Sequence, residues 1–183
     1  MNIWFRNSTK QTLLSYGTFA LLASIGIMSL SAPVASAEWK EGSKLPDLKH
    51  FGLEGTIPVL TGRVVVVDFW ASWCGPCKTS FPLLDIIYRQ FTSNGVVLLA
   101  VSVDEKAADM EKFLENHPVS FPVVRDARQR LVEAASVDGM PTSFVIDKDG
   151  VIQVVHKGFH AGKTEIELVR EIESLLKKAK GAK

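Results

Sequence analysis

Cysteine is scarce in this 183-residue sequence, which contains only two. Two cysteines cannot build a disulfide-rich scaffold or a four-cysteine zinc site. Bulk charge is also nearly absent, because the formal net charge is +1, so nothing indicates a nucleic-acid partner held by electrostatics. The sequence has no internal repeat or low-complexity linker, and its length suits one domain better than a barrel of repeated β/α units. We therefore expect one ordinary globular domain.

Charge is missing altogether from residues 11–37. Arg6 and Lys10 precede this stretch, an apolar run occupies residues 19–30, and Ala-Ser-Ala closes it at residues 35–37. A basic start, an apolar middle and an A-x-A end are typical of a secretory signal peptide. We predict a signal peptide at residues 1–37 and a folded domain at residues 38–183, located in the periplasm or otherwise outside the cytoplasm. The alternative is an uncleaved anchor, since the stretch is long enough to span a bilayer, and only then do we expect membrane contact.

The remaining 146 residues carry 19 basic and 20 acidic side chains. A domain of that size buries roughly two thirds of the surface of its unfolded chain, so it needs no covalent cross-link to fold. The two cysteines are therefore free for chemistry.

The hydrophobic pattern of these residues predicts an α/β fold with one mixed sheet flanked by helices. A run of valines at residues 64–70 is apolar on both faces, as expected of a central strand. An Asp-Gly turn at residues 149–150 predicts an antiparallel hairpin. The other predicted strands lie at residues 96–103, 120–124, 142–146 and 151–156, and the helices at residues 76–93, 106–116, 128–135 and 163–178. A further hairpin is expected around residues 48–51 and 56–60.

The sequence Trp73-Cys74-Gly75-Pro76-Cys77 lies between the predicted central strand and the following helix. Two intervening residues allow the two sulfurs to meet across one helical turn. Cys74 falls at the helix N-terminus, where unpaired N–H groups and the helix dipole favour a thiolate. Because the thiolate is the attacking species in disulfide exchange, this position activates Cys74. Cys77, one turn inside, is suited to resolving the mixed disulfide.

An acidic residue, Asp68, interrupts the predicted central strand. Burial among valines disfavours the charged form, so the pKa of this carboxyl should rise toward neutrality. Asp68 is therefore a candidate acid/base.

The stretch from Asp68 to Lys78 resembles the active-site sequence of the thioredoxin superfamily, and specifically its exported TlpA/ResA-type branch of thiol-disulfide oxidoreductases. Gly139-Met140-Pro141-Thr142 is similar to the cis-proline loop of that family. The predicted helix and strand between Val103 and Arg128 resemble an insertion that the exported branch carries and plain thioredoxin lacks. The resemblance covers residues 38–178 and implies a thioredoxin-like fold with this insertion before the cis-proline loop.

The resemblance also implies roles for the site residues. Cys74 is expected to be the nucleophile, Cys77 the resolving thiol, and Asp68 the acid that exchanges a proton with Cys77. Pro141 is expected to be cis, and the backbone of Met140 to pair with an extended client segment as an added strand.

Three further residues are expected to contact substrate: Trp73 as an apolar rim, and Gly75 with Pro76 between the cysteines. The Gly-Pro pair is shared with thioredoxin, whose potential is about −270 mV, and this favours a reductant.

The predicted function is disulfide exchange with client proteins outside the cytoplasm. A Cys74–Cys77 dithiol carries out this exchange and needs no cofactor. Relatives draw electrons from a membrane protein, and we expect such a donor here and a monomeric enzyme.

Two alternatives use the same fold. A thiol peroxidase favours threonine three residues before the active cysteine, where this chain has Ala71. A copper metallochaperone favours three residues between its cysteines plus a histidine, whereas only two residues separate Cys74 from Cys77 here. A zinc site combining the cysteines with His156 and His160 is disfavoured by the 78 residues that separate Cys77 from His156.

Overall fold

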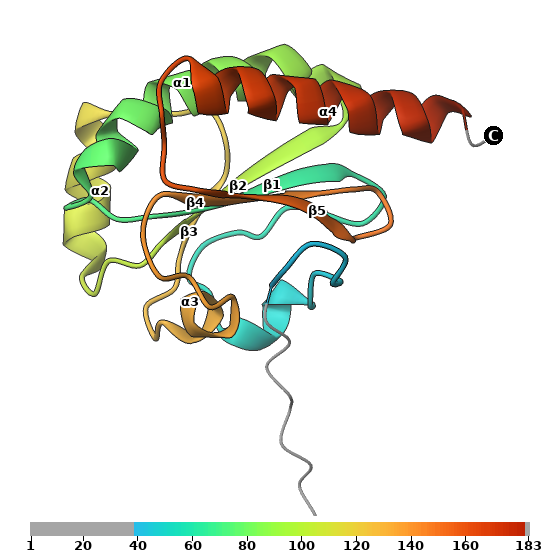
Figure 1. Ribbon diagram of the computed structural model, residues 1–183. Coiled ribbons are helices and arrows are strands. Elements are labelled where there is room, and N and C mark those ends of the chain that lie inside the picture. The colour runs from blue at the N-terminus through green and yellow to red at the C-terminus, as the bar shows by residue number, and fades with distance from the viewer. Residues whose placement is uncertain (1–38, 182–183) are drawn as a thin grey trace, which may run out of the picture. The chain divides into compact units, whose positions relative to one another are not determined.

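The computed structural model describes residues 39–181, in which five strands form one sheet between layers of helices (Figure 1). The predicted signal peptide at residues 1–37 lies outside this range. The strands are β1 (Val64–Trp70), β2 (Val96–Ser102), β3 (Val123–Arg125), β4 (Thr142–Ile146) and β5 (Ile152–Lys157). The helices are α1 (Gly75–Phe91), α2 (Ala107–Asn116), α3 (Arg130–Ala134) and α4 (Lys163–Gly181), with 3-10 turns η1 (Leu48–Phe51) and η2 (Thr92–Asn94). None of the helices in this range is both long enough and apolar enough to cross a bilayer.

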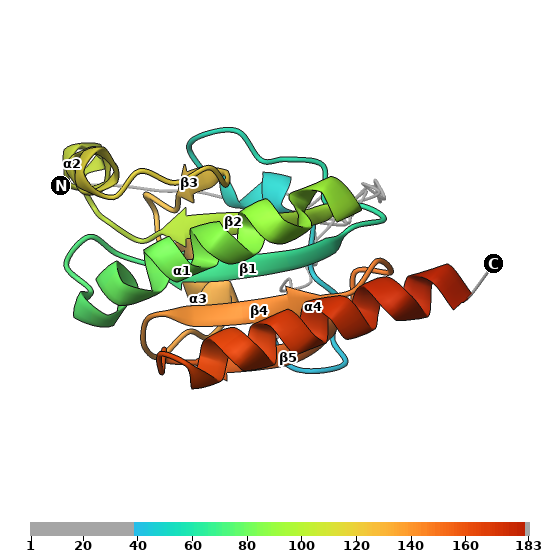
Figure 2. The ribbon, with the colours of Figure 1, turned by 90° about the horizontal axis from the view of Figure 1, so that it is seen from above.

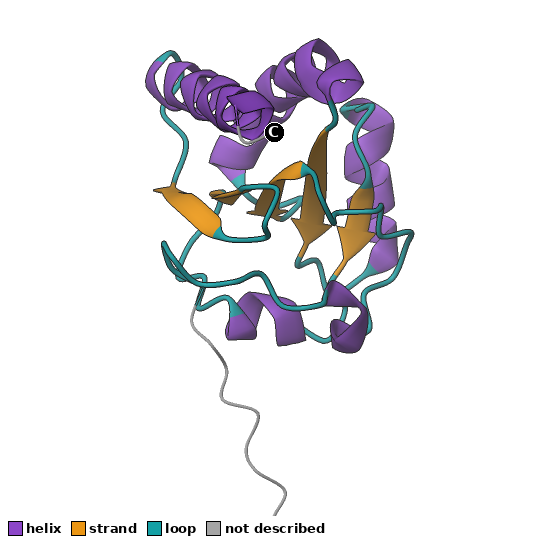
Figure 3. Ribbon diagram, turned by 90° about the vertical axis from the view of Figure 1, so that its right-hand side faces the viewer, coloured by secondary structure: helices purple, strands orange, loops and turns teal. Residues whose placement is uncertain are grey.

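The sheet has the strand order β3-β2-β1-β4-β5. β1 pairs in parallel with β2, and β2 with β3, whereas β4 is antiparallel to both β1 and β5. Helices α1 and α4 lie over one face, α1 above β1 and β2 and α4 above β4 and β5 (Figure 2). The short helices α3 and η1 lie on the other face (Figures 1 and 3). This is the mixed, helix-flanked sheet that the sequence predicts.

β1 is the central strand of the sheet, and all seven of its residues are buried. Its β-branched valines suit a pleated strand covered on both sides. Alternate residues point to opposite faces of a strand, and two aromatic clusters pack accordingly. On the face of the short helices the cluster is Trp39, Phe69 and Phe144, and on the face of α1 it is Trp70, Phe81 and Phe113. The carboxyl end of β1 is thus held rigidly where the cysteine motif begins.

Most of the predicted elements are confirmed, with ends that differ by a few residues. The Asp-Gly turn does join β4 and β5 as an antiparallel hairpin. α2 and β3 are the helix and strand expected between Val103 and the next helix. The strand predicted at residues 120–124 is shifted to Val123–Arg125, because Pro122 has no N–H to donate and the Ser120 N–H is bound to Asp85.

The hairpin predicted near the start of the domain is wrong. Residues 48–51 form the 3-10 turn η1 instead, because the Asp47 carboxylate accepts the Lys49 N–H and starts a turn. Gly52, with a φ of 70°, then ends it in the left-handed conformation that glycine adopts without strain. Residues 56–60 form no strand, and Pro58 within them cannot donate a ladder hydrogen bond. The chain before β1 meets the sheet at two isolated bridges, Lys44 with Val151 and Glu54 with Arg125.

Candidate active site

Cys74 and Cys77 are joined by a disulfide at the start of α1, with their Cα atoms 5.3 Å apart. Cys74 is the N-cap residue, in extended conformation, and Pro76 occupies the first turn, where a missing N–H costs nothing. The Cys77 N–H donates to the Cys74 Sγ at 3.2 Å. The sulfur of Cys74 therefore occupies the position that a capping oxygen takes at other helices.

The two cysteines differ in their access to solvent. Cys74 is 5% exposed, whereas Cys77 is completely buried. An N–H group and the positive end of the helix dipole both point toward Cys74, and both stabilise a thiolate there. Access and electrostatics thus favour attack by Cys74 and resolution by Cys77.

Asp68 is fully buried in the middle of β1. Desolvation raises the pKa of its carboxyl from the ordinary 3.8 to about 7, although a hydrogen bond from Ser143 lowers it. The Ser143 hydroxyl donates to Oδ1 at 2.6 Å, while Oδ2 has no partner among residues 39–181. The neighbouring position on β2 is Ala100, so no cation offsets the burial from that strand. A carboxyl of this kind can take up or release a proton near neutral pH.

The side chain of Asp68 lies on the α1 face of the sheet. Trp70, two residues on, packs against Phe81 of α1, and residues two apart in a strand share a face. Asp68 and the buried Cys77 of α1 therefore belong to the same layer of the molecule. Its free Oδ2 is the atom available to a proton donor in that layer.

The Met140–Pro141 peptide bond is cis, as predicted. Thr142, the next residue, pairs with Phe69 near the carboxyl end of β1, so the cis-proline loop lies at the end of the sheet where the cysteine motif begins. The carbonyl of Pro141 accepts a hydrogen bond from the Gly158 N–H at 2.8 Å, which ties the loop to the end of β5.

Trp73 and Met140 line a common hollow of about 340 Å³. Trp73 is 68% exposed, which is unusual for so large an apolar residue. The hollow also includes residues to which the sequence assigned no role in the site, because Val103 and the residues around α3 come together only in the fold. They are Val103, Gln129, Val132, Glu133, Ser136, Val137 and Asp138.

Another residue that the sequence analysis missed is Asp104, whose buried carboxylate binds the loop just before Cys74. The signal in the sequence was its position just beyond the end of β2, the strand beside β1. Loops that follow parallel strands meet at one edge of the sheet, where functional residues gather.

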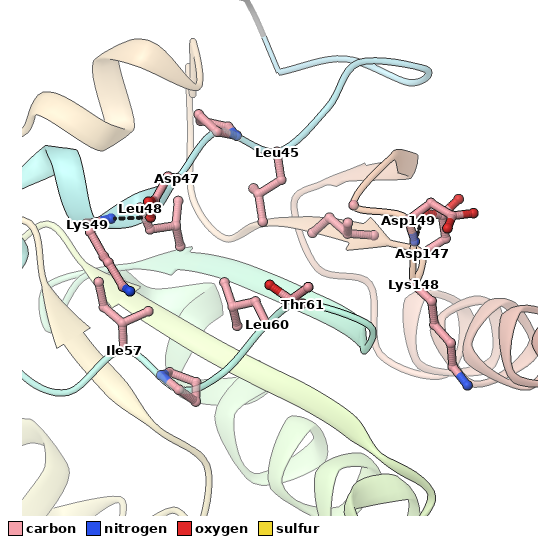
Figure 4. A pocket seen from close by; sticks show the side chains of 14 residues that line it. Leu45, Asp47, Leu48, Lys49, Ile57, Leu60, Thr61, Asp147, Lys148 and Asp149 are labelled. Atoms are coloured by element: carbon pink, nitrogen blue, oxygen red, sulfur yellow. Dashed lines mark hydrogen bonds between the residues drawn. The ribbon is translucent and has the colours of Figure 1, made fainter.

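A second hollow, of about 400 Å³, lies away from the cysteines. It is lined by Leu45, Asp47 and Leu60 near the start of the domain and by the β4–β5 turn (Figure 4). Because Leu60 precedes β1 whereas Cys74 follows it, this hollow lies at the opposite end of the central strand. Among residues 39–181 no cluster of three or more His, Cys, Asp or Glu side chains could hold a metal ion.

Comparison with known proteins agrees with this geometry. The AhpC/TSA family model matches residues 42–155. Thiol-disulfide oxidoreductase ResA of Bacillus subtilis is 36% identical over 143 residues, covering 74% of this chain and 78% of the relative. ResA of Geobacillus thermodenitrificans is 34% identical over 137 residues, covering 73% and 77%.

Solved structures show the same relationship. A Chlorobium tepidum protein assigned as thiol:disulfide interchange protein DsbE superposes with a TM-score of 0.70 at 38% identity, covering 76% of this chain and 99% of that protein. StoA from Bacillus subtilis superposes with a TM-score of 0.54 at 26% identity, covering 61% and 83%. The chain belongs to the AhpC/TSA family and, within it, to the thioredoxin-fold thiol-disulfide oxidoreductases of the ResA type.

Proposed function

We propose that this enzyme is exported and reduces disulfides of client proteins outside the cytoplasm, with Cys74 as the nucleophile. The observation that carries the proposal is the pair of unequal cysteines at the start of α1. Cys74 is 5% exposed and its sulfur receives the Cys77 N–H, while Cys77 is fully buried.

In the first step the Cys74 thiolate attacks one sulfur of a client disulfide. A bond forms between Cys74 Sγ and that sulfur, the client S–S bond breaks, and the departing client thiolate takes a proton from water. The mixed disulfide holds the client against the exposed rim at Trp73. The backbone beside the cis-proline, at Met140, binds the extended client segment as an added strand.

In the second step Cys77 attacks Cys74 Sγ and the client leaves as its second thiolate. The client gains two electrons, and the Cys74–Cys77 disulfide is left on the enzyme. Cys77 must first lose its proton, and a buried thiol does so only to a nearby base. Asp68 has the position, on the α1 face, and the pKa, about 7, to accept that proton. A membrane donor returns two electrons to the enzyme, and no cofactor is required because the electrons reside in the cysteine pair.

Export rests on the first 37 residues, whose pattern is that of a cleaved leader. This point is tested by expressing the full-length chain in a bacterium and determining the mass of the protein recovered from its envelope. Cleavage after Ala37 gives a chain that begins at Glu38, whereas an intact N-terminus found in the membrane fraction indicates an anchor instead.

The activity is tested by insulin reduction with dithiothreitol as the electron source. The expected result is turnover by the wild type and loss of turnover in Cys74→Ser. Cys77→Ser that has been reduced and then freed of dithiothreitol should accumulate a mixed disulfide with insulin. Hydrogen peroxide replaces insulin in the comparison assay, because consumption of peroxide at a similar rate indicates a thiol peroxidase. Undiminished insulin reduction by Cys74→Ser contradicts the mechanism.

The direction of electron flow is tested by the midpoint potential in glutathione buffers. A reductant is expected near the value of thioredoxin, about −270 mV. A midpoint near that of DsbA, about −120 mV, contradicts the assignment as a reductant.

A further inference from the structure

Asp104 lies two residues beyond the end of β2 and is 2% exposed. Its carboxylate accepts three different donors. The Ser72 hydroxyl lies 2.7 Å from Oδ1, the Ser72 N–H lies 3.0 Å from Oδ2, and the Ser102 hydroxyl lies 2.8 Å from Oδ2. Hydrogen bonds to a carboxylate are roughly twice as strong as those between neutral groups. A buried carboxylate this well satisfied fixes the groups around it.

The segment that Asp104 holds is the short connection from β1 to the active site. Ser72 lies two residues before Cys74 and is half-buried. On either side of it, the Trp70 carbonyl accepts the Val103 N–H at 2.9 Å and the Ala71 carbonyl accepts the Cys74 N–H at 3.0 Å. Trp73 projects into solvent and contributes little packing. The bonds to Asp104 are therefore the main restraint on the middle of this connection.

Asp104 is itself held from the side of the inserted strand. Arg125, the last residue of β3, donates to the Asp104 carbonyl at 3.2 Å and to the Glu105 carbonyl at 2.7 Å. Its guanidinium is in turn paired with Glu54 at 2.6 Å. The inserted strand β3 is thus connected to the loop before Cys74 through the backbone and side chain of one aspartate.

We infer that Asp104 is a positioning residue that holds Cys74 in place for ring closure by Cys77. This inference rests on the proposed roles of the two cysteines. In the closing step the Cys77 thiolate attacks Cys74 Sγ, the bond from Cys74 to the bound thiol breaks, and the released thiolate takes up a proton. Holding two reacting groups in position raises their effective concentration. Cys77 is fixed within α1, so the mobility of the Cys74 side depends on the loop that Asp104 restrains.

The inference is tested on the closing step alone. The reduced full-length protein is mixed with oxidised glutathione, and the decay of the glutathione adduct on Cys74 is followed by acid quenching and mass spectrometry. The variants are Asp104→Asn, Ser72→Ala and the double variant. The control is Asp85→Asn, because Asp85 holds Ser120 in the same way, through its N–H and its hydroxyl, both at 2.6 Å. It removes the same charge and breaks the same kind of contact away from the cysteine loop.

We expect closure to slow about tenfold in Asp104→Asn and about threefold in Ser72→Ala, as a loss of positioning implies. The double variant should close no more slowly than Asp104→Asn, because both substitutions break the same contact between Ser72 and Asp104. Asp85→Asn should close at the wild-type rate. The loss should hold at every pH, whereas a charge effect alone only moves the midpoint of the pH profile. Ser72→Ala keeps the charge and provides the result if Asp104→Asn does not fold.

Closure within twofold of the wild type in Ser72→Ala and Asp104→Asn overturns the inference. Equal slowing in Asp85→Asn also overturns it, because the effect is then one of general stability. Neither outcome affects the proposed function, which fails separately if reduced Cys77→Ser forms no glutathione adduct on Cys74.

Discussion

Replacing Asp68 with asparagine should change how the stability of this enzyme depends on pH. The carboxyl is fully buried, and desolvation raises its pKa from 3.8 to about 7. Between these two values the folded protein keeps the proton on Asp68, whereas the unfolded chain has lost it. Folding stability therefore falls as pH rises from about 4 to about 7 and becomes level above that. Asparagine resembles the neutral form and does not titrate, so the variant lacks this loss.

The size of the effect follows from the two pKa values. Each unit of difference is worth about 1.4 kcal/mol, so the full cost of ionising Asp68 in the folded state is about 4 kcal/mol. About 2 kcal/mol of this is already present at pH 5, because the unfolded carboxyl is ionised there. The stability of Asp68→Asn relative to the wild type should thus increase by roughly 2–3 kcal/mol between pH 5 and pH 8.

The assay is urea unfolding of the oxidised proteins at pH 5, 6, 7 and 8, with the free energy of the wild type subtracted from that of the variant. Oxidation keeps the cysteines from titrating, and subtraction removes the other groups. A difference that is constant over this range, or that shrinks as pH rises, refutes the assignment of a raised pKa to Asp68.

Asp85→Asn is a control of opposite sign for the same assay. Burial tends to raise the pKa of Asp85, but hydrogen bonds from Ser120 and the charge of Arg89 outweigh it and lower the pKa below 3.8. Stability from this group is present above about pH 4 and is lost in more acidic solution. The difference between Asp85→Asn and the wild type should therefore stay level between pH 5 and pH 8.

Two further substitutions probe the packing around the site, and a third at an exposed position is their control. Ser143→Ala removes the hydrogen bond that lowers the pKa of Asp68, so a carboxyl-carbon NMR titration should show that pKa above about 7, and an unchanged midpoint contradicts the role of Ser143. Phe113→Ala removes a buried ring whose centroid lies 4.7 Å from that of Trp70, and it should lower the free energy of unfolding by about 3–5 kcal/mol. Ile86→Ala, at a side chain 59% exposed, should cost less than about 1 kcal/mol in the same urea titration.

The sequence was sufficient where one local pattern decided the structure. The valines of β1 placed the central strand, and the same valines predicted that Asp68 would be buried with a raised pKa. The spacing of the cysteines and Pro76 placed the start of α1 within one residue. These features depend on residues that are adjacent along the chain, so they can be predicted from the sequence alone.

The sequence was insufficient where contacts between distant residues decided the structure. The carboxylate of Asp104 binds Ser72, 32 positions away, and no pattern in the sequence near either residue predicts this contact. Residues 48–60 contain apolar runs that suit a hairpin, yet the Asp47 cap and Pro58 lead to a turn and an irregular segment. The cis bond at Pro141 was expected only from the resemblance to thioredoxin, because an X-Pro sequence does not by itself specify the isomer.

The central claim, that Cys74 is the attacking sulfur and Cys77 the resolving one, is tested most directly by trapping with insulin. Reduced full-length Cys77→Ser is mixed with insulin, quenched with acid and digested, and the disulfide-linked peptides are identified by mass spectrometry. The variant lacking both cysteines is the control for non-covalent capture. Cys77→Ser should give a stable adduct in which an insulin cysteine is bonded to Cys74, and the double variant should give none. Absence of that adduct, together with full insulin reduction by Cys74→Ser, contradicts the assignment of Cys74 as the attacking sulfur.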